Sequence, residues 1–231
     1  MIKDEFNKIA SLEEALSYIK SGSTLMFGGF GGIGTPPSLV DGILEKGINE
    51  LTIIGNDTGF PNIGIGRLVR ERRIKRIIAS HIGSNPIAGQ LMTAGEIDVE
   101  FVPQGTLAER IRAGGVGLGG ILVDVGMDNE IVSKNKQRVT VDGAEFLLEK
   151  PLAADVSIIF AKKSDPFGNL VYDKSARNMN PLIAMAGKFT IAEVEEIVPL
   201  GSLEPEEIIT PGVYVDLIVK SNGVNWQWVW E

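Results

Sequence analysis

The sequence contains no cysteine and a single histidine, His81, among its 231 residues. The lack of cysteine excludes disulfides, thiolate nucleophiles and cysteine-ligated metals. With one histidine, a histidine-based zinc site or a histidine-rich acid–base centre is not expected either. We therefore expect no metal, and the chemistry of any site has to come from carboxylates, amides, hydroxyls or the backbone.

The sequence also lacks long apolar runs and an excess of positive charge. No apolar run reaches the roughly 18–20 residues that cross a bilayer, so no membrane partner is expected. The N-terminal residues carry charges of both signs and no apolar signal segment, which predicts a cytoplasmic protein. The formal net charge of −8 argues against nucleic acid as a partner, because phosphate binding needs clustered Lys and Arg.

Glycine, by contrast, is abundant, with 28 of 231 residues, and it clusters. The most informative cluster covers residues 28–34, which follow an apolar run at 24–27 and precede a predicted helix at 38–46. A strand, a glycine-rich turn and a helix start are typical of phosphate-binding loops, because backbone N–H groups and the helix dipole favour anions. Residues 29–34 also match G-x-G-x-x-G, the fingerprint of dinucleotide-binding folds.

Two prolines argue against the dinucleotide interpretation. In a dinucleotide-binding fold the third glycine lies inside the helix, but here Thr35, Pro36 and Pro37 follow Gly34 directly. Proline fits the first turn of a helix and not its interior, so the helix has to begin after the fingerprint. An NAD-dependent oxidoreductase and a loop that only reverses the chain stay open as alternatives.

The first half of the sequence repeats a strand, a polar loop and a helix. This order predicts an open, largely parallel α/β sheet covered by helices. Ligands of such sheets bind at the carboxyl ends of the strands, so we expect the loops there to face one crevice. The predicted strands cover residues 24–27, 51–54, 74–79 and 99–102, and further helices are predicted at about 67–73 and from Thr106. The loops in question are residues 28–36, 55–59, 80–86 and 103–105.

The second half carries additional antiparallel strands. Asp142 and Gly143 separate two short strand-like segments, which predicts a β-hairpin over residues 138–148 with a primed turn. No linker and no internal repeat is apparent, so we predict a single domain covering residues 1–231. Further strands are predicted at residues 156–160, 170–172 and 213–219.

A longer pattern around the first glycine cluster is more specific. Gly-Gly-Phe-x-x-x-Gly-x-Pro, preceded by a strand, resembles the signature of the α subunit of family I CoA-transferases. The resemblance covers nearly the whole chain and looks closest to the short-chain branch that uses acetate, butyrate or acetoacetate. Further matching stretches are Asn56-Asp57-Thr58, residues 80–86 and 103–115, Asn178-Met179-Asn180-Pro181 and Thr210-Pro211-Gly212-Val213.

This resemblance implies a transferase with a ping-pong scheme. A glutamate attacks the acyl-CoA thioester, a mixed anhydride forms, and CoA returns to give an enzyme thioester that the incoming acid resolves. In the family this glutamate belongs to the β subunit, so this chain is expected to hold no catalytic residue and to be inactive alone. The expected partner is the β subunit in an α₂β₂ heterotetramer, with coenzyme A as a co-substrate and no permanently bound cofactor.

The resemblance also implies where the substrate binds. Asn56 and Gln104 follow strands and carry amides that can donate to an acyl oxygen, on which charge develops during transfer. Asp57 is expected to hold its loop or to tune the choice of substrate. The glycine cluster is expected to approach CoA or its glutamyl thioester through Gly28, Gly29, Phe30, Gly31, Gly32, Ile33 and Gly34.

Two residues in the matching stretches are interpreted structurally. Thr106-Leu107-Ala108-Glu109 has the pattern of a capping box, in which Glu109 bonds back to the backbone of Thr106. We therefore do not expect Glu109 to be the nucleophile. His81 is interpreted as a hydrogen-bonded structural histidine.

The C-terminal tail holds all three tryptophans of the chain. Trp226, Trp228 and Trp230 alternate, so they share one face if the tail is a strand. They would then cover either a partner subunit or the domain's own core.

A non-catalytic sugar-phosphate-binding module is a further alternative for the whole chain.

Overall fold

The computed structural model describes residues 6–226 and contains one main sheet of nine strands. Its strands run parallel in the order β1-β12-β11-β9-β2-β3-β4-β5, and β10 pairs antiparallel with β9. This confirms the predicted open, largely parallel α/β fold. The bounds are β1 Ile9–Ala10, β2 Thr24–Phe27, β3 Leu51–Ile54, β4 Ile74–Ala79, β5 Asp98–Phe101, β9 Val156–Ser164, β10 Leu170–Val171, β11 Thr190–Ile197 and β12 Leu217–Lys220.

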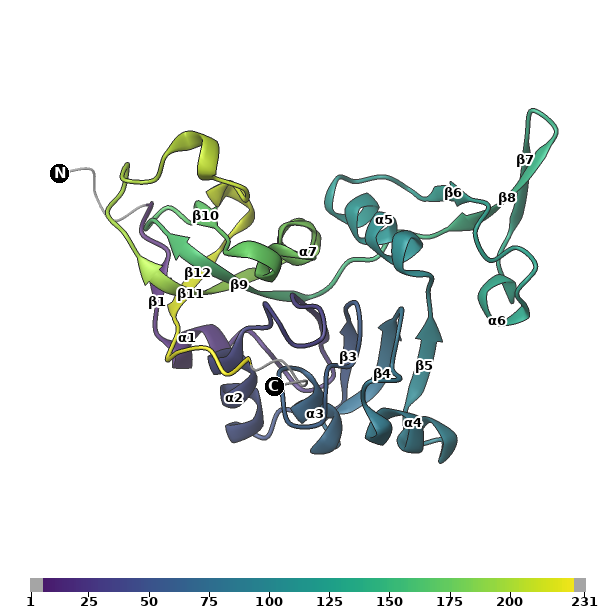
Figure 1. The fold of residues 1–231 in the computed structure, drawn as a ribbon, viewed down its shortest axis with the longest axis horizontal. Helices are drawn as coiled ribbons and strands as arrows, with labels where there is room; N and C mark the ends of the chain where they lie inside the picture. The colour runs from purple at the N-terminus through teal and green to yellow at the C-terminus, as the bar shows by residue number, and fades with distance from the viewer. Residues whose placement is uncertain (1–5, 227–231) are drawn as a thin grey trace.

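Helices cover both faces of this sheet (Figure 1). The helices α1 to α4 lie on one face, and α5 and α7 lie on the other. Their bounds are α1 Leu12–Leu16, α2 Pro37–Glu45, α3 Gly66–Arg70, α4 Pro86–Thr93, α5 Gln104–Gly115 and α7 Asn180–Ala186.

The strand β2 lies where the strand order of the sheet reverses. On one side of it the chain continues outward through β3, β4 and β5, and the other side is filled by β9, β11 and β12. Loops that follow strands at such a point line the ligand crevice of open α/β sheets. The glycine cluster directly follows β2 and therefore begins at this point.

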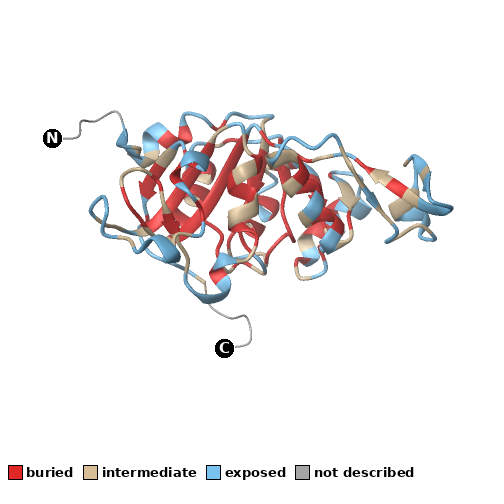
Figure 2. Ribbon diagram, turned by 90° about the horizontal axis from the view of Figure 1, so that it is seen from above, coloured by how far each residue is buried: buried red, intermediate tan, exposed pale blue. Residues whose placement is uncertain are grey.

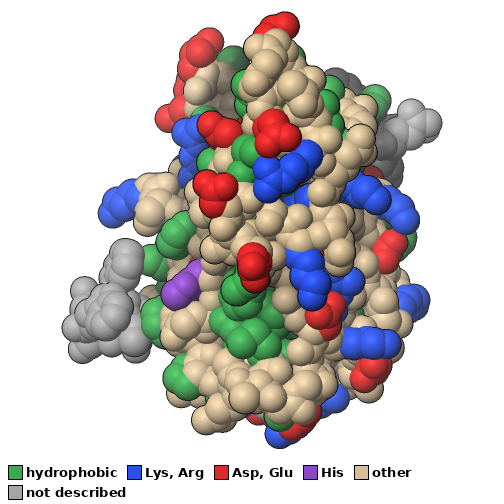
Figure 3. Space-filling model, turned by 90° about the vertical axis from the view of Figure 1, so that its right-hand side faces the viewer, with side chains coloured by type: hydrophobic (Ala, Val, Ile, Leu, Met, Phe, Trp, Pro, Cys, Tyr) green, Lys and Arg blue, Asp and Glu red, His purple; other side chains and the backbone are tan. Residues whose placement is uncertain are grey.

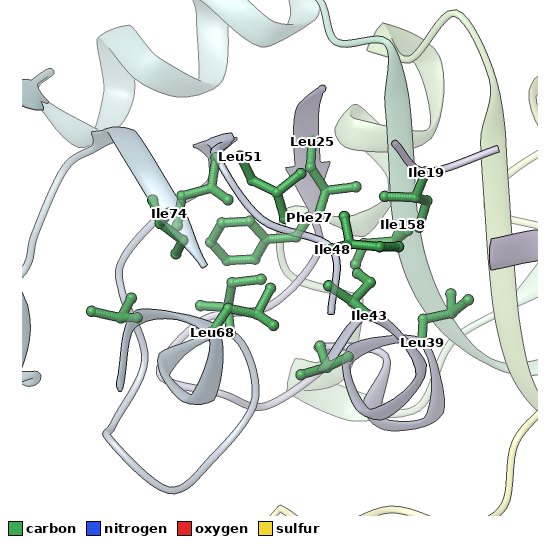
Figure 4. Packing of buried hydrophobic residues seen from close by; sticks show 14 of the residues in the cluster. Ile19, Leu25, Phe27, Leu39, Ile43, Ile48, Leu51, Leu68, Ile74 and Ile158 are labelled. Atoms are coloured by element: carbon green, nitrogen blue, oxygen red, sulfur yellow. The ribbon is translucent and has the colours of Figure 1, made fainter. Parts of the chain in front are cut away.

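Buried side chains form one core beneath each helical layer. On β2, Leu25 and Phe27 belong to the core with α2 and α3, whereas Met26 belongs to the core with α5 and α7. Figure 4 shows Leu25 and Phe27 surrounded by leucines and isoleucines from these helices and the neighbouring strands. Figure 2 shows the same buried centre, with exposed residues concentrated in the outer loops. This packing fixes the strand ends from which the site loops leave.

A smaller antiparallel sheet projects from the main body (Figure 1). Its strand order is β6-β8-β7, and we call residues 116–149 the arm. Asp142 and Gly143 have φ angles of 49° and 83°, which confirms the predicted hairpin with a primed turn. The arm contains β6 Ile121–Val123, α6 Glu130–Ser133, β7 Arg138–Val141 and β8 Ala144–Glu149.

The sequence pattern does not predict β11, although this strand lies inside the main sheet beside β9. Three glutamates, Glu193, Glu195 and Glu196, make the segment look too acidic for a central strand. Two of these charges pair with lysines on β9, Lys162 with Glu195 and Lys163 with Glu196. β11, like β9 and β12, extends the parallel sheet, whereas β6, β7, β8 and β10 are antiparallel strands of the second half, as predicted.

Several predicted boundaries also shift. The strand predicted at 213–219 is a 3₁₀ turn at Gly212–Tyr214 followed by β12. The helix predicted at 67–73 is the shorter α3, and α5 begins at Gln104 rather than at Thr106. The single-domain organisation stays a prediction.

On the side of the molecule that carries the arm, Lys and Arg side chains are interspersed with Asp and Glu (Figure 3). Arg76, for example, pairs with both Asp98 and Glu100. Within residues 6–226, every helix is too short or too polar to span a membrane. The same residues contain no group of three or more His, Asp or Glu side chains placed to hold a metal ion.

Candidate functional site

The glycine cluster folds into a tight hairpin after β2. The N–H of Phe30 donates to the carbonyl of Ile33 at 3.0 Å, and the N–H of Ile33 donates back at 3.2 Å. Gly31 and Gly32 form the turn with φ angles of 59° and 94°, which side chains rarely adopt. We call residues 29–34 the first hairpin.

Most backbone N–H groups of the first hairpin are satisfied inside the protein. Gly29 donates to the side chain of Asn178 and Gly31 to that of Asp57, while Phe30 and Ile33 donate to each other. In the described chain, only Gly32 and Gly34 of this hairpin have an N–H without a protein acceptor. The hairpin is therefore not an open cradle of N–H groups, and its one exposed residue is Phe30, with Gly31 and Ile33 partly exposed.

Two asparagines from the second half of the chain clamp the first hairpin. Asn178 accepts from the N–H of Gly29 at 3.1 Å and donates to the carbonyl of Ile33 at 2.8 Å. Asn180 is fully buried and donates to the carbonyl of Gly34 at 3.0 Å. A Cβ atom on Gly28 would lie 1.7 Å from Oδ1 of Asn180, so only glycine fits there. The Asn-Met-Asn-Pro stretch is thus the structural partner of the glycine cluster.

Asp57 connects the first hairpin to the loop after β3. Its Oδ2 accepts from the N–H of Gly31 at 2.8 Å and from Nδ2 of Asn56 at 2.9 Å, and its Oδ1 accepts from the N–H of Gly59 at 2.7 Å. The carboxylate is buried, and these three donors hold it in place. Of the two roles expected for Asp57, the structure supports the one that holds the loop.

Asn56 is buried beside Asp57, and its side-chain amide bonds to both Asp57 and Ser80. Its Oδ1 accepts from Oγ of Ser80 at 3.2 Å, and one of its two amide hydrogens goes to Asp57. An amide NH₂ carries two hydrogens, so Asn56 keeps one donor that no described residue engages.

Loops from four consecutive parallel strands meet in one pocket of about 400 Å³. This confirms the predicted convergence of the loops at residues 28–36, 55–59, 80–86 and 103–105, which we call the pocket loops. The lining residues are Phe30, Gly31, Asn56, Asp57, Phe60, Ser80, His81, Ser84 and Gln104.

Gln104 and His81 present exposed side chains at this pocket. The Nε2 of Gln104 has only a weak partner, the sulfur of Met179 at 4.0 Å, so its donors are available to a ligand. No hydrogen bond among residues 6–226 involves the imidazole of His81, so its interpretation as a hydrogen-bonded structural residue is wrong.

Glu109 does not form the predicted capping box. Because α5 begins at Gln104 with Pro103 as its N-cap, Glu109 lies in the middle of the helix rather than in its first turn. Its carboxylate is half-exposed and pairs with Arg112 at 2.8 Å. Glu109 is therefore a surface residue, and it does not line the pocket.

Trp226 packs against its own chain. Its indole Nε1 donates to the carbonyl of Thr35 at 3.1 Å, and its ring meets that of Phe160 edge-on with centroids 4.5 Å apart. The predicted alternation with Trp228 and Trp230 lies outside the described residues. For Trp226, the contact with the domain's own core is the one observed.

A buried carboxylate of β11 supports the helix that follows the first hairpin. Glu193 accepts from the N–H groups of Ser38 and Leu39 at the start of α2, at 3.1 and 3.0 Å, and from Oγ of Ser221 at 2.5 Å. Burial raises the pKa of Glu193, and the hydrogen bonds from the two serines and Leu39 oppose that rise.

With this geometry in place, the comparison with known families is decisive. Residues 9–221 match the family described as Coenzyme A transferase. The chain belongs to the coenzyme A transferase family. The dinucleotide alternative has no support in the structure either, because α2 of this transferase begins at Pro37, after the fingerprint has ended.

Individual relatives agree with this family assignment. A probable coenzyme A transferase subunit alpha of Bacillus subtilis (strain 168) is 58% identical over 226 residues, which cover 98% of this chain and 99% of that protein. The acetate CoA-transferase subunit alpha of Escherichia coli (strain K12) is 50% identical over 214 residues, 93% of this chain and 97% of that protein. The chain is therefore a CoA-transferase subunit of the α type.

A solved structure supports the fold of this transferase chain. The acyl-CoA transferase of Escherichia coli O157:H7, in a thioester complex with CoA, matches with a TM-score of 0.82 and 26% identity over 93% of this chain. The match covers 47% of that protein, so this chain spans about half of its length.

Proposed function

We propose that this chain is the α subunit of a short-chain acyl-CoA:carboxylate CoA-transferase for acetate, butyrate or acetoacetate. The observation that best supports this proposal is that Asn56 and Gln104, from two different loops, line the same pocket with amide donors. Relatives named as α subunits of acetate and of acetoacetyl-CoA:acetate/butyrate CoA-transferases support the choice of substrates. We propose the cytoplasm as its location.

In the proposed reaction the nucleophile is a glutamate of a β subunit. Its carboxylate oxygen attacks the thioester carbonyl and expels the CoA thiolate, which leaves a mixed anhydride. The thiolate then attacks the glutamyl carbonyl and releases the first carboxylate, and the incoming acid reverses both steps to leave as acyl-CoA. The CoA thioester complex of the structurally similar acyl-CoA transferase supports such an intermediate.

The residues of this chain would bind and orient the acyl group. The free amide donors of Gln104 and Asn56 suit the acyl oxygen, where negative charge develops as the carbonyl is attacked. Asp57 holds Asn56 and Gly31 in position through its hydrogen bonds. The glycine cluster, from Gly28 to Gly34, would approach CoA at the edge that the partner subunit completes, in an α₂β₂ assembly.

The test uses Gln104→Ala in the complex reconstituted with the β subunit. Removing one donor to the developing oxyanion should lower kcat/KM on the order of 100-fold and leave assembly intact. Gln90→Ala is the matched control, because Gln90 is exposed on α4 and does not line the pocket. Unchanged kinetics for Gln104→Ala would contradict the acyl-pocket assignment.

The chain alone tests the position of the nucleophile. Without a β subunit it should not exchange labelled acetate into acetyl-CoA, whereas the reconstituted complex should do so. Exchange by the isolated chain would place the nucleophile here and refute that part of the proposal.

A further inference from the structure

Contrary to the expectation of no internal repeat, the chain contains a short one. Gly-Phe-x-x-Ile-Gly occurs at residues 29–34 and again, thirty positions later, at residues 59–64. The second copy also follows a buried parallel strand, β3 in place of β2. We call residues 59–64 the second hairpin.

The two copies adopt the same local structure. Phe60 and Ile63 form an antiparallel bridge just as Phe30 and Ile33 do. The closing glycines, Gly34 and Gly64, have φ angles of 81° and 54°. The repeated residues therefore encode one small hairpin that is used twice.

The two hairpins lie side by side at the carboxyl ends of neighbouring strands. A Cβ atom on Gly32 would lie 2.8 Å from Cγ2 of Ile63, and one on Gly31 would lie 3.9 Å from Cε2 of Phe60. Asp57 also joins them, because it accepts from Gly31 in the first hairpin and from Gly59 in the second. This arrangement sets Phe30 and Phe60 at the same pocket.

The residues that line the pocket are of two chemical kinds. Asn56, Ser80 and Gln104 carry amide or hydroxyl groups, while Phe30 and Phe60 carry aromatic rings, which we call the aromatic wall. Phe30 is 53% exposed although the hairpin around it is tightly hydrogen-bonded. Aromatic surface left open beside polar groups suits a ligand with an apolar tail and a polar head.

We propose that the aromatic wall of Phe30 and Phe60 contacts the aliphatic tail of the acyl group and sets its preferred length. This inference rests on the proposed function. With the acyl oxygen at the amides, the chain of the acid extends toward the two rings. Phe60 is the stronger determinant, because its ring is only partly exposed and is held more firmly than that of Phe30, which is 53% exposed.

The experiment measures chain-length preference in the complex reconstituted with the β subunit. We expect Phe60→Ala to raise the ratio of kcat/KM for hexanoyl-CoA to that for acetyl-CoA about tenfold or more, since a methylene in an apolar pocket discriminates on this scale. Phe60→Trp should shift the ratio in the opposite direction, and Phe60→Leu should fall between Phe60→Ala and the unmodified chain. Phe6→Ala is the matched control, because Phe6 is 51% exposed and packs on Phe167, away from the pocket.

Calorimetric binding of acetate, butanoate and hexanoate to the same complexes separates this inference from the proposed function. A complex that transfers CoA, with a ratio unmoved by Phe60→Ala and Phe60→Trp, would overturn the inference alone. A complex without transferase activity would refute the proposed function, and the chain-length order of the three binding constants would then decide the role of the wall. Loss of assembly in both Phe60→Ala and Phe60→Leu would likewise overturn the inference and assign the rings to subunit contact.

Discussion

The pocket loops and the arm differ in which side chains they bury. In the pocket loops even polar side chains are buried and hydrogen-bonded, among them Asn56, Asp57 and Asn85. In the arm only Leu147 and Glu149 are buried, and several large apolar side chains are exposed. The exposed apolar residues are Val116, Leu118, Leu122, Val125, Ile131 and Val141.

This difference separates a preformed site from a weakly supported extension. The pocket loops are bonded to one another, so the geometry of the site exists before any ligand arrives. A three-stranded sheet with so small a core has little stability of its own. The arm is instead attached at its base by Arg110 of α5, which donates to Glu100 and to the carbonyl of Lys150 at 2.8 Å each.

The largest loss of stability is expected from a substitution that breaks the attachment of the arm. Arg110→Ala removes a buried cation that also lies 3.6 Å from the buried Glu149, and should cost about 3–5 kcal/mol of unfolding free energy. Arg112→Ala on the same helix removes only an exposed pair with Glu109 and should cost at most about 1 kcal/mol. Denaturant unfolding measures both, and hydrogen exchange should show the arm losing protection first. Equal costs for the two variants would contradict the role given to Arg110.

The second-largest loss of stability is expected from a substitution that loosens the pocket loops. Asp57→Ala leaves the N–H groups of Gly31 and Gly59 and the amide of Asn56 without their acceptor, and should cost about 2–3 kcal/mol. Asp57→Asn keeps one oxygen acceptor and should cost less. Denaturant unfolding gives the free energies, and transferase activity of the reconstituted complex reports on the pocket. A fully stable Asp57→Ala chain would show that the loops do not depend on this carboxylate.

Two carboxylates should make opposite contributions to the pH dependence of stability: Glu193, which bonds to the start of α2 after the first hairpin, and Glu100, which bonds to Arg110 at the base of the arm. Burial raises the pKa of Glu193, so its folded form holds a proton more tightly and its contribution to stability falls as pH rises above 4.5. Burial of Glu100 acts in the same direction, but Arg110 and Arg76 outweigh it and lower the pKa. The contribution of Glu100 is therefore present above 4.5 and is lost as pH falls.

Unfolding free energies between about pH 3 and 8 test this contrast. Relative to Glu193→Gln, the unmodified chain should lose stability with rising pH, and relative to Glu100→Gln it should gain stability. Slopes of the same sign for the two comparisons would contradict the assignment.

The smallest effect is expected on the exposed surface of the arm. Ile131 is 71% exposed, so Ile131→Ser should change the unfolding free energy of the isolated chain by less than about 0.5 kcal/mol. Thermal unfolding is sufficient to detect a larger change. A cost above about 1 kcal/mol would mean that the arm packs more tightly than its exposure indicates.

Local signals in the sequence predict the parts of the fold that depend on local chemistry. Asp142 and Gly143 specify the turn of the arm, and Pro36 and Pro37 place the start of α2 after the glycines. The convergence of the pocket loops follows from the order of strands and loops alone. Gln104 reaches the pocket as expected, although the register of its helix is two residues off.

The remaining features depend on contacts between distant residues. Nothing near Asn178 indicates that it bonds to Gly29, 149 positions away. The acidic composition of β11 does not indicate a strand, because Glu195 and Glu196 find their lysine partners only when β9 lies beside them. The second hairpin is not predicted from the glycine pattern, because Pro61 and Asn62 stand where the first hairpin has two glycines at its turn.

The clamp by Asn178 and Asn180 affects the order in which parts of the chain fold during synthesis. As the chain emerges from the ribosome, the first hairpin appears early, but two of its hydrogen-bonding partners follow roughly 150 residues later. Its strand β2 likewise waits for β9 before both of its edges are paired. Contacts over such separations form slowly, because a long loop has to close first. The pocket should therefore be completed late in synthesis, and a nascent chain that ends before Asn178 should expose Phe30 on an unclamped loop.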